Sequence, residues 1–247
     1  MSDFVQSLER GLAVIRAFDA DHPEMTLSDV ARVTGLTRAA ARRFLLTLVD
    51  LGYMRTDGRL FTLRPKVLEL GYSYLSSLGL PDVAQPHLEK LAAEVHESCS
   101  VSVLDGSDIV YVARVPTKRI MNVMIEIGTR FPAHATSMGR VMLAAQENLD
   151  DFLATTPLTA LTDRTITDPV ELKSELSRVR AQGWSMVDGE LEHGLRSIAA
   201  PIRNKGKVIA AVNISTHVSR PIESVHDDLV PPLLATAEAI SADLNLS

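Results

Sequence analysis

The sequence is poor in the residues from which metal and cofactor sites are built. Cys99 is the only cysteine, which excludes an internal disulfide and any multi-cysteine metal site. The seven histidines are scattered singly, without the spacing of metal ligands. The chain contains no GxGxxG, GxxxxGKS/T, GxSxG, HExxH or CxxC pattern, so the common nucleotide, hydrolase and zinc templates are absent. We therefore expect no metal and no cofactor.

Long hydrophobic runs are also missing. No uninterrupted apolar stretch is long enough to span a bilayer. The first residues, MSDFVQSLERG, have neither the basic n-region nor the apolar h-region of a signal peptide. A cytoplasmic protein without a membrane partner is expected. Its 247 residues, 46% hydrophobic and 23% charged, suit two modest soluble domains or one large one.

Positive charge is scarce overall but not locally. The net charge is −6, which argues against nucleic acid as a partner of the whole chain. Residues 1–80 nevertheless carry 10 Lys/Arg against 9 Asp/Glu, whereas residues 81–247 carry 15 against 22. Between residues 30 and 49 there are four arginines and no acid. The charge that DNA requires is concentrated in one short segment.

That segment lies within residues 26–51, TLSDVARVTGLTRAAARRFLLTLVDL, which predict two short helices around a tight turn. Thr26 or Ser28 can cap the first helix, and Thr37 can cap the second. Gly35 can end the first helix in the left-handed region. A helix-turn-helix is the arrangement that this spacing favours.

The second of these helices has two distinct faces. Its apolar stripe at helical spacing is Ala41, Phe44, Leu45, Leu48 and Leu51. Its opposite face carries Ala39, Arg42 and Arg43, with Arg38 at the edge. Exposed arginines at the start of such a helix are typical of a recognition helix in the major groove. Similar helices with merely solvated arginines occur in many all-α domains, so this pattern alone leaves both interpretations open.

The residues that follow favour DNA binding. Residues 52–63, GYMRTDGRLFTL, predict two short strands around Asp57-Gly58, a preferred hairpin turn pair. Arg55 and Arg59 would lie near the tip, within reach of phosphates beside the groove. Helix, turn, helix and basic wing, in this order, predict a winged helix-turn-helix.

Two further helices flank this predicted domain. Val5, Leu8, Leu12 and Ile15 recur at helical spacing and predict a helix that packs over the winged domain, while Val14 is available for a dimer contact. Residues 66–78, opened by Pro65 and closed by Gly79 and Pro81, predict a linker helix.

The remaining residues alternate between helical and extended patterns without regular βαβ repetition, which predicts an α+β domain. We expect helices over residues 84–97, 137–146, 149–154, 169–181 and 231–244. We expect strands over residues 99–104, 109–115, 120–127, 197–202 and 207–214.

Two segments of this second domain concentrate polar groups beside turns. In residues 128–140, GTRFPAHATSMGR, an extended run meets a helix capped by Thr136 or Ser137, and the free N–H groups at its start suit a carboxylate. In residues 187–201, VDGELEHGLRSIAAP, acidic residues and His193 precede a strand. Asn213 and Ser215 alternate on the next strand and so share one face. A capped helix with nothing bound and a solvated turn are the alternatives.

Taken together, these motifs resemble those of the IclR-type transcriptional regulators over nearly the whole chain. The resemblance is carried by LERGLAVIRAFD, the helix-turn-helix, LRPKVLELG, PAHATSMGRVMLA and DGELEHGLRSIAAPIRNKGKVIAAVNIS. Within the family, TRAAARRFLLTL, PAHATSMGR and ELEHGLRS are most similar to the β-ketoadipate-pathway regulators. The resemblance implies a winged helix-turn-helix domain (residues 1–64), a linker helix (65–80) and a GAF-like effector domain (81–247).

The resemblance also implies an effector site at the helix after PAHATSMG, the loop before GLRS and the strand ending NIS. Carried over to this sequence, with the two polar residues that precede the helix, the expected effector-binding residues are Arg130, His134, Ser137, Met138, Asp188, Glu190, Leu195, Ser197, Asn213 and Ser215. Two features fit an aromatic acid poorly. Aromatic residues, which would stack on an aromatic ring, are only 4% of the chain. The predicted site also contains acidic residues, which would repel an anion unless Arg130 or Arg196 compensates their charge or the acids bind hydroxyl groups of the ligand.

The sequence thus predicts a DNA-binding transcriptional regulator that responds to a small carboxylate, an aromatic acid or β-ketoadipate-pathway intermediate. Its expected partners are a pseudo-palindromic DNA operator, the effector, a second or further copies in a homodimer or tetramer, and RNA polymerase. The expected DNA-binding residues are Ser28, Thr37, Arg38, Ala39, Arg42, Arg43, Arg55 and Arg59. The alternatives are an enzyme with an appended DNA-binding domain, using Asp188, Glu190 or His193 as acid or base, and a DNA-binding scaffold with an empty pocket.

Overall fold

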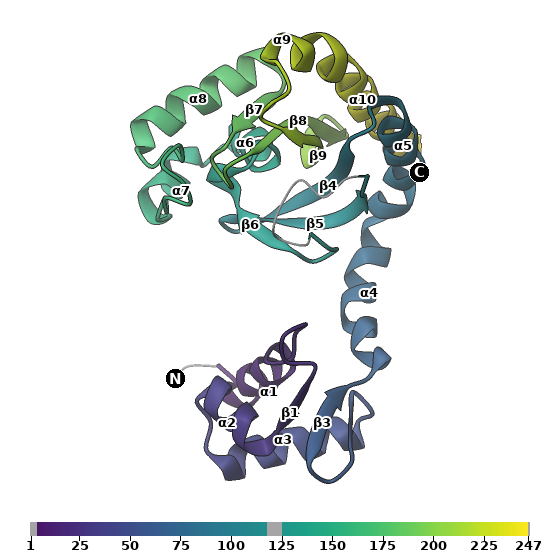
Figure 1. The fold of residues 1–247 in the computed structure, drawn as a ribbon, viewed down its shortest axis with the longest axis vertical. Helices are drawn as coiled ribbons and strands as arrows, with labels where there is room; N and C mark the ends of the chain where they lie inside the picture. Colours follow the sequence, from purple (N-terminus) through teal and green to yellow (C-terminus); the bar gives the residue numbers. More distant parts are fainter. Residues whose placement is uncertain (1–3, 118–124, 247) are drawn as a thin grey trace. The chain divides into compact units, whose positions relative to one another are not determined.

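The computed structural model describes residues 4–117 and 125–246. The chain divides into two compact units, Met1–Ser77 and Leu78–Ser247, and each is described by itself. Helix α4 (Leu68–Leu78), preceded by the 3-10 turn η1 (Pro65–Val67), connects them (Figure 1). Within the described residues, no helix is long and apolar enough to cross a bilayer.

The N-terminal unit is a three-helix domain with a small antiparallel sheet. Its elements are α1 (Gln6–Arg16), β1 (Glu24–Thr26), α2 (Leu27–Thr34), α3 (Arg38–Asp50), β2 (Met54–Thr56) and β3 (Leu60–Leu63). The strand order is β1-β3-β2, so the β2–β3 hairpin is the predicted wing and β1 extends its sheet. Strand β1 is an addition that the sequence patterns do not predict.

The helix caps follow the sequence. Thr26 Oγ1 accepts from the backbone N–H of Asp29, whose carboxylate in turn accepts from Thr26, and this capping box opens α2. Gly35 ends α2 at φ 67°, in the left-handed region that glycine adopts without strain. Thr37 caps α3 by accepting from Ala40 N–H. Thr26 rather than Ser28 is therefore the first cap.

The predicted inward face of α1 is wrong. Val5, Leu8 and Leu12 are 60%, 63% and 44% exposed, whereas Val14, which was expected to be free for a dimer, is fully buried. The buried side of α1 is formed by Val14 and continues into Ala17, and Ile15 is the member of the predicted stripe that packs against this core. Helical spacing identifies a stripe but does not say which of two apolar faces the domain covers.

The apolar stripe of α3 is mostly confirmed. Ala41, Leu45 and Leu48 are buried and Phe44 is partly buried. Leu51 is 53% exposed because it lies past the last turn of α3, as its C-cap. With this stripe inside, the opposite face of α3 is left to solvent.

The C-terminal unit is built on a six-stranded antiparallel sheet of order β6-β5-β4-β9-β8-β7. Its strands are β4 (Ser98–Asp105), β5 (Asp108–Val115), β6 (Arg130–Pro132), β7 (Ser185–Asp188), β8 (Leu195–Asn204) and β9 (Lys207–His217). The two long hairpins, β4–β5 and β8–β9, agree with the predicted strand pairs. The edge strands β6 and β7 are too short to show an alternating pattern in sequence. The strand predicted over 120–127 lies mostly outside the described residues, and 125–127 form no strand.

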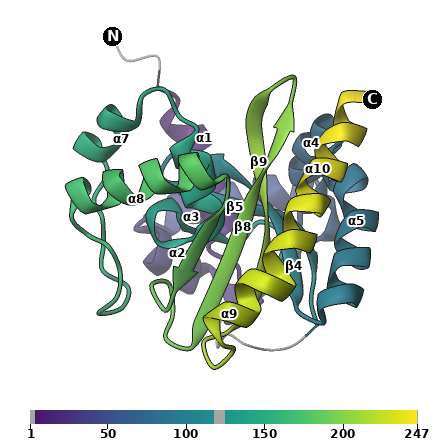
Figure 2. The same ribbon diagram turned by 90° about the horizontal axis from the view of Figure 1, so that it is seen from above.

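Helices cover both faces of this sheet. They are α5 (Leu80–Val95), α6 (Ser137–Ala144), α7 (Leu149–Thr155), α8 (Pro169–Gln182), α9 (Ile222–Ser224) and α10 (Val230–Leu246), with the 3-10 turn η2 (Ala133–Ala135) and the π-helical turn η3 (Val225–Leu229). Helices α5 and α10 lie side by side on one face, and α6 packs on the other, with α8 beyond it (Figure 2). The whole of α6 is buried, which places its N-terminus against the sheet.

Gly139 allows α6 to approach the preceding turn. A Cβ at this position would lie 2.1 Å from the carbonyl oxygen of Ala133, well inside van der Waals contact. Because that atom belongs to the backbone, only a shift of the helix or the turn can relieve the overlap. Glycine is thus required by space here and not by backbone angle.

We predict that Gly139→Ala destabilises the C-terminal unit by about 2 kcal/mol or more, as overpacking a rigid contact does. Trp184, the only tryptophan, lies in this unit, so its fluorescence during denaturant unfolding reports on the unit selectively. Ser177→Ala, on the exposed side of α8, is the control and should change stability by less than about 0.5 kcal/mol. Equal midpoints for the two variants would contradict the close packing.

Candidate functional site

The exposed face of α3 carries the predicted DNA-contacting residues. Arg38, Ala39, Arg42 and Arg43 are all exposed. Among the described residues, the guanidinium groups of Arg38, Arg42 and Arg43 have no carboxylate partner. Thr37, the N-cap, is exposed at the start of the same helix. The helix therefore presents uncompensated positive charge, which suits an anionic partner.

The wing presents two more arginines. Arg55 on β2 and Arg59 in the turn are exposed. The turn is rigid because Asp57 Oδ1 accepts from the backbone N–H groups of Arg59 and Leu60, at 2.8 and 2.7 Å. These backbone hydrogen bonds lower the pKa of the Asp57 carboxyl, and the bond from Leu60 has the largest effect. Ser28 is exposed on the first turn of α2, in the same unit.

In the C-terminal unit, a small cavity lies between the start of α6 and the sheet. Its volume is about 20 Å³, which is room for about one water molecule. Its lining comes from β5, η2, α6, the β7–β8 segment and β9: Tyr111, Ala135, Thr136, Ser137, Met138, Val187, Leu191, Leu195, Ser197, Asn213 and Ser215.

The floor of the cavity is a hydrogen-bonded polar cluster. Ser137 Oγ lies 2.7 Å from Ser197 Oγ, and Asn213 Nδ2 donates to Ser197 Oγ and to Ser215 Oγ, at 3.0 Å each. Asn213 Oδ1 is buried without a hydrogen-bond partner. Whichever way the amide is oriented, one of its polar atoms stays unsatisfied, which is costly in a protein interior. The cluster is thus built to bind one more polar group.

Six of the ten predicted effector-binding residues meet in this lining. They are Ser137, Met138, Leu195, Ser197, Asn213 and Ser215. Tyr111 was missed because it lies far upstream in the sequence, with no motif around it. Its ring forms an edge-to-face pair with Phe131 at 5.9 Å, so an aromatic wall exists despite the low aromatic content.

The four other predicted residues serve the surrounding structure. Arg130 is exposed and binds Asp105 and Asp108 at the β4–β5 turn, away from the cavity. His134 is buried and bonds the carbonyl of Thr159 through Nε2 at 3.1 Å. Burial is the main cause that lowers the pKa of His134.

The acidic residues near the cavity are neutralised by arginines. Glu190 pairs with the buried Arg140, and Asp188 pairs with Arg196 at 3.0 Å. Arg196 thus compensates one of these acids, whereas Arg130 pairs with Asp105 and Asp108 instead. Arg140 was not identified from the sequence. Each of the two carboxylates therefore has a paired cation, although the buried Asp188 Oδ1 has no hydrogen-bond partner among the described residues.

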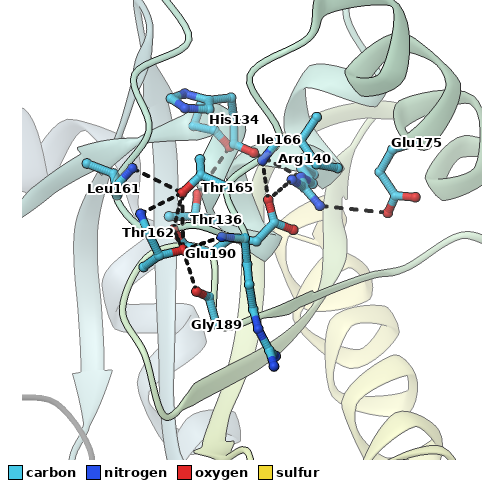
Figure 3. Close-up of polar contacts among 12 residues, drawn as sticks. His134, Thr136, Arg140, Leu161, Thr162, Thr165, Ile166, Glu175, Gly189 and Glu190 are labelled. Carbon is cyan, nitrogen blue, oxygen red and sulfur yellow. Dashed lines mark hydrogen bonds and ion pairs between the residues drawn. The ribbon is translucent and has the colours of Figure 1, made fainter.

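Arg140 is the centre of a buried network that holds several segments together (Figure 3). Its guanidinium donates to Glu190 and to the carbonyl of His134, and lies 3.9 Å from Glu175 on α8. Glu190 in turn accepts from Ile166 N–H at 3.0 Å. One buried cation thereby connects α6 to the loop after β7, to the segment before α8 and to α8 itself.

The segment around Thr165 contributes further bonds to the same loop. Thr165 Oγ1 donates to the carbonyl of Glu190, and Thr162 Oγ1 donates to that of Gly189, each at 2.7 Å (Figure 3). The loop that carries Leu191 into the cavity lining is therefore held from outside. His193, in contrast, is 70% exposed and lies 3.6 Å from the exposed Asp163, outside the cavity lining.

We predict that Glu190→Ala destabilises the C-terminal unit by about 3 to 5 kcal/mol, because it leaves the charge of Arg140 buried and poorly compensated. Trp184 fluorescence in denaturant titrations measures this. The control is Asp150→Ala, which breaks an exposed pair with Lys173 and should cost less than about 1 kcal/mol. A Glu190→Ala effect as small as the control would show that the network contributes little to stability.

Comparisons with known proteins agree with this geometry. Two family descriptions match: the IclR helix-turn-helix domain over residues 7–58, and the bacterial transcriptional regulator IclR C-terminal domain over residues 72–242. The Pca regulon regulatory protein of Pseudomonas putida is 46% identical over 239 residues, covering 95% of this chain and 82% of that one. The p-hydroxybenzoate hydroxylase transcriptional activator of Acinetobacter baylyi is 39% identical, covering 94% and 89%.

Solved structures show the same fold over the full length. A chain from Rhodococcus sp. RHA1 is 61% identical, with a TM-score of 0.88, covering 98% of this chain and 99% of that one. An IclR homolog from Microbacterium hydrocarbonoxydans, solved in complex with 4-hydroxybenzoate, is 28% identical, with a TM-score of 0.87 and coverage of 98% and 100%. These relatives are transcriptional regulators and not enzymes, which excludes the catalytic alternative. The chain belongs to the IclR family of bacterial transcriptional regulators.

Proposed function

We propose that this regulator binds a pseudo-palindromic operator as a homodimer or tetramer and responds to a small carboxylate effector of aromatic-acid catabolism. In this proposal residues 1–64 bind DNA, 65–80 form the linker and 81–247 bind the effector. The protein acts in the cytoplasm, and RNA polymerase is its further partner at the promoter. The effector class is supported by relatives whose names refer to the Pca regulon and to p-hydroxybenzoate hydroxylase.

The uncompensated arginines of α3 carry the DNA part of the proposal. Arg42 and Arg43 are exposed on consecutive positions, and no described carboxylate neutralises either of them. Arginine binds phosphate and guanine in a bidentate manner, so these side chains suit both backbone and base contacts. Arg55 and Arg59 add phosphate contacts from the wing. Ser28 and Thr37 lie at helix starts, where hydroxyl and N–H groups bind phosphate.

The unsatisfied polar cluster at the start of α6 carries the effector part. The helix N-terminus offers free N–H groups and a positive dipole end, and the buried Asn213 amide lacks one partner beside it. A carboxylate or hydroxyl of the effector supplies that partner. A ring cannot enter about 20 Å³, so binding requires side chains such as Met138, Leu191 and Leu195 to move outward. Met138 is well suited to this because methionine changes conformation easily.

We predict that Arg42→Ala combined with Arg43→Ala lowers operator affinity at least about tenfold and reduces its salt dependence, by about 0.9 in log–log slope per lost phosphate contact. The DNA is a duplex selected by the wild-type protein from a random library, and binding is followed by fluorescence anisotropy at several salt concentrations. Lys205→Ala with Lys207→Ala removes the same charge from the other unit and should leave both quantities unchanged. An unchanged slope in the α3 variant would refute the assignment of the recognition helix.

We predict that an effector acid stabilises the C-terminal unit without being consumed. At 100 times its Kd a ligand adds about 2.7 kcal/mol, which a thermal-shift assay detects. The panel contains 4-hydroxybenzoate, other hydroxylated benzoates and β-ketoadipate. Ser197→Ala, which removes one hydroxyl of the cluster, should weaken the response, and Ser177→Ala on the exposed side of α8 should not. No response to any acid would support a scaffold with an empty pocket.

A further inference from the structure

Strand β5 contains a bulge that places the side chains of Tyr111 and Arg114 on the same face of the sheet. Tyr111 pairs with Ser102 of β4, and Arg114 pairs with Ser100, with the register shift between them. Residues three apart normally lie on opposite faces of a strand. The extra residue, Val112, restores a common face. Arg114 therefore lies on the side of the sheet that Tyr111 contributes to the cavity lining.

Arg114 extends toward the polar cluster of the cavity. Its Nη1 donates to Ser100 Oγ at 3.0 Å. Ser100 is fully buried and is the direct register partner of Asn213 on β9, so both side chains lie on one face. The unsatisfied amide of Asn213 and the guanidinium of Arg114 thus flank the same buried serine. Arg114 and Asn213 are separated by one strand, or about 10 Å across the sheet.

No carboxylate neutralises Arg114 in the described part of the chain. The other arginines that are buried or half-buried in this unit have one: Arg140 pairs with Glu190, Arg196 with Asp188, and Arg220 with Glu97. Within the described residues, the side-chain hydrogen bond of Arg114 goes to the neutral hydroxyl of Ser100. A half-buried cation without a counterion is unfavourable unless a binding partner supplies the charge.

The surroundings of Arg114 suit a flat acid. Tyr111 is its neighbour on the same face and lines the cavity. Burial raises the pKa of Tyr111 to about 12, so the phenol stays neutral at physiological pH and does not repel an anion. The cluster of Ser197, Asn213 and Ser215 offers hydrogen bonds at about 10 Å from Arg114, which is close to the length of a small aromatic acid. This face of the sheet therefore has a cation at one end, an aromatic side chain beside it and a neutral polar cluster at the other end. Arg114 lies outside the lining of the small cavity, so a ligand that reaches it has to widen the cavity along the sheet.

We propose that Arg114 is the carboxylate anchor of the effector site, and that the site takes a small acid with a hydrogen-bonding group at the end opposite its carboxylate. This inference rests on the proposed effector function and deepens it. The carboxylate pairs with the guanidinium beside Ser100, the body of the ligand lies against Tyr111, and the opposite end bonds the cluster of Ser197, Asn213 and Ser215. Charge-assisted bonds of this kind are the strong ones in a partly buried site.

The test compares an acid with its neutral analogue. Isothermal titration measures the affinities of the full-length protein for 4-hydroxybenzoate and 4-hydroxybenzamide, which differ in the charged end only. The wild type should prefer the acid by about tenfold or more. Arg114→Gln should abolish that preference and leave the affinity for the amide within about twofold. Arg114→Lys, which retains the charge, should keep part of the preference.

Arg130→Gln is the matched control because it removes an arginine of β6 whose charge is already paired with Asp105 and Asp108, and it should keep the preference. If Arg114→Gln weakens acid and amide equally, or leaves the preference intact, Arg114 is not the anchor although the effector function stands. Wild-type protein that binds neither 4-hydroxybenzoate nor any other acid of the panel overturns both. Trp184 fluorescence verifies that each variant is folded.

Discussion

The effector unit depends on the burial of a single arginine. Arg140 is only 1% exposed, and its charge is balanced by Glu190. Because a buried ion requires a nearby counterion and satisfied hydrogen bonds, every segment that supplies one is fixed in position. The segments so fixed are α6, the loop after β7 and the segment before α8, and two of them contribute to the cavity lining. The position of the cavity is thus a consequence of where one cation is buried.

The two units use arginine in opposite ways. On α3 and the wing, arginines are exposed and lack carboxylate partners among the described residues, so their charge is available to DNA. In the C-terminal unit, Arg140 and Arg196 are enclosed and neutralised, and act as connectors within the fold. The net charge of −6 hides this division. Distinguishing arginines that are free from those that are paired with carboxylates indicates a DNA partner better than the net charge of the chain does.

Local signals in the sequence were sufficient for much of the fold. Thr26, Gly35 and Thr37 mark the ends of α2 and α3 because capping depends on residues within one turn. The inward face of α1 could not be predicted, since Val14 and Leu12 are both apolar and only tertiary packing decides between them. Edge strand β7 is paired by its neighbour and carries little pattern of its own.

The cavity residues also divide into those that local sequence signals identify and those that depend on tertiary contacts. Ser137, Ser197 and Asn213 are predicted from their motifs and from alternating strand positions, and they line the cavity. Tyr111 and Arg140 were missed because their roles arise from partners far away in sequence. Glu190 is predicted as an effector residue from the family resemblance, and the sequence does not show that Arg140 pairs with it.

The bulge in β5 determines which changes of length this strand can absorb. Deleting Val112 would leave Tyr111 and Arg114 two residues apart, still opposite Ser102 and Ser100, so both side chains would stay on the same face. Deleting one further residue between them would instead turn one of the two side chains toward the face covered by α5 and α10. In relatives that share this fold, the length of this strand can therefore alter the ligand site without a substitution at any contact residue.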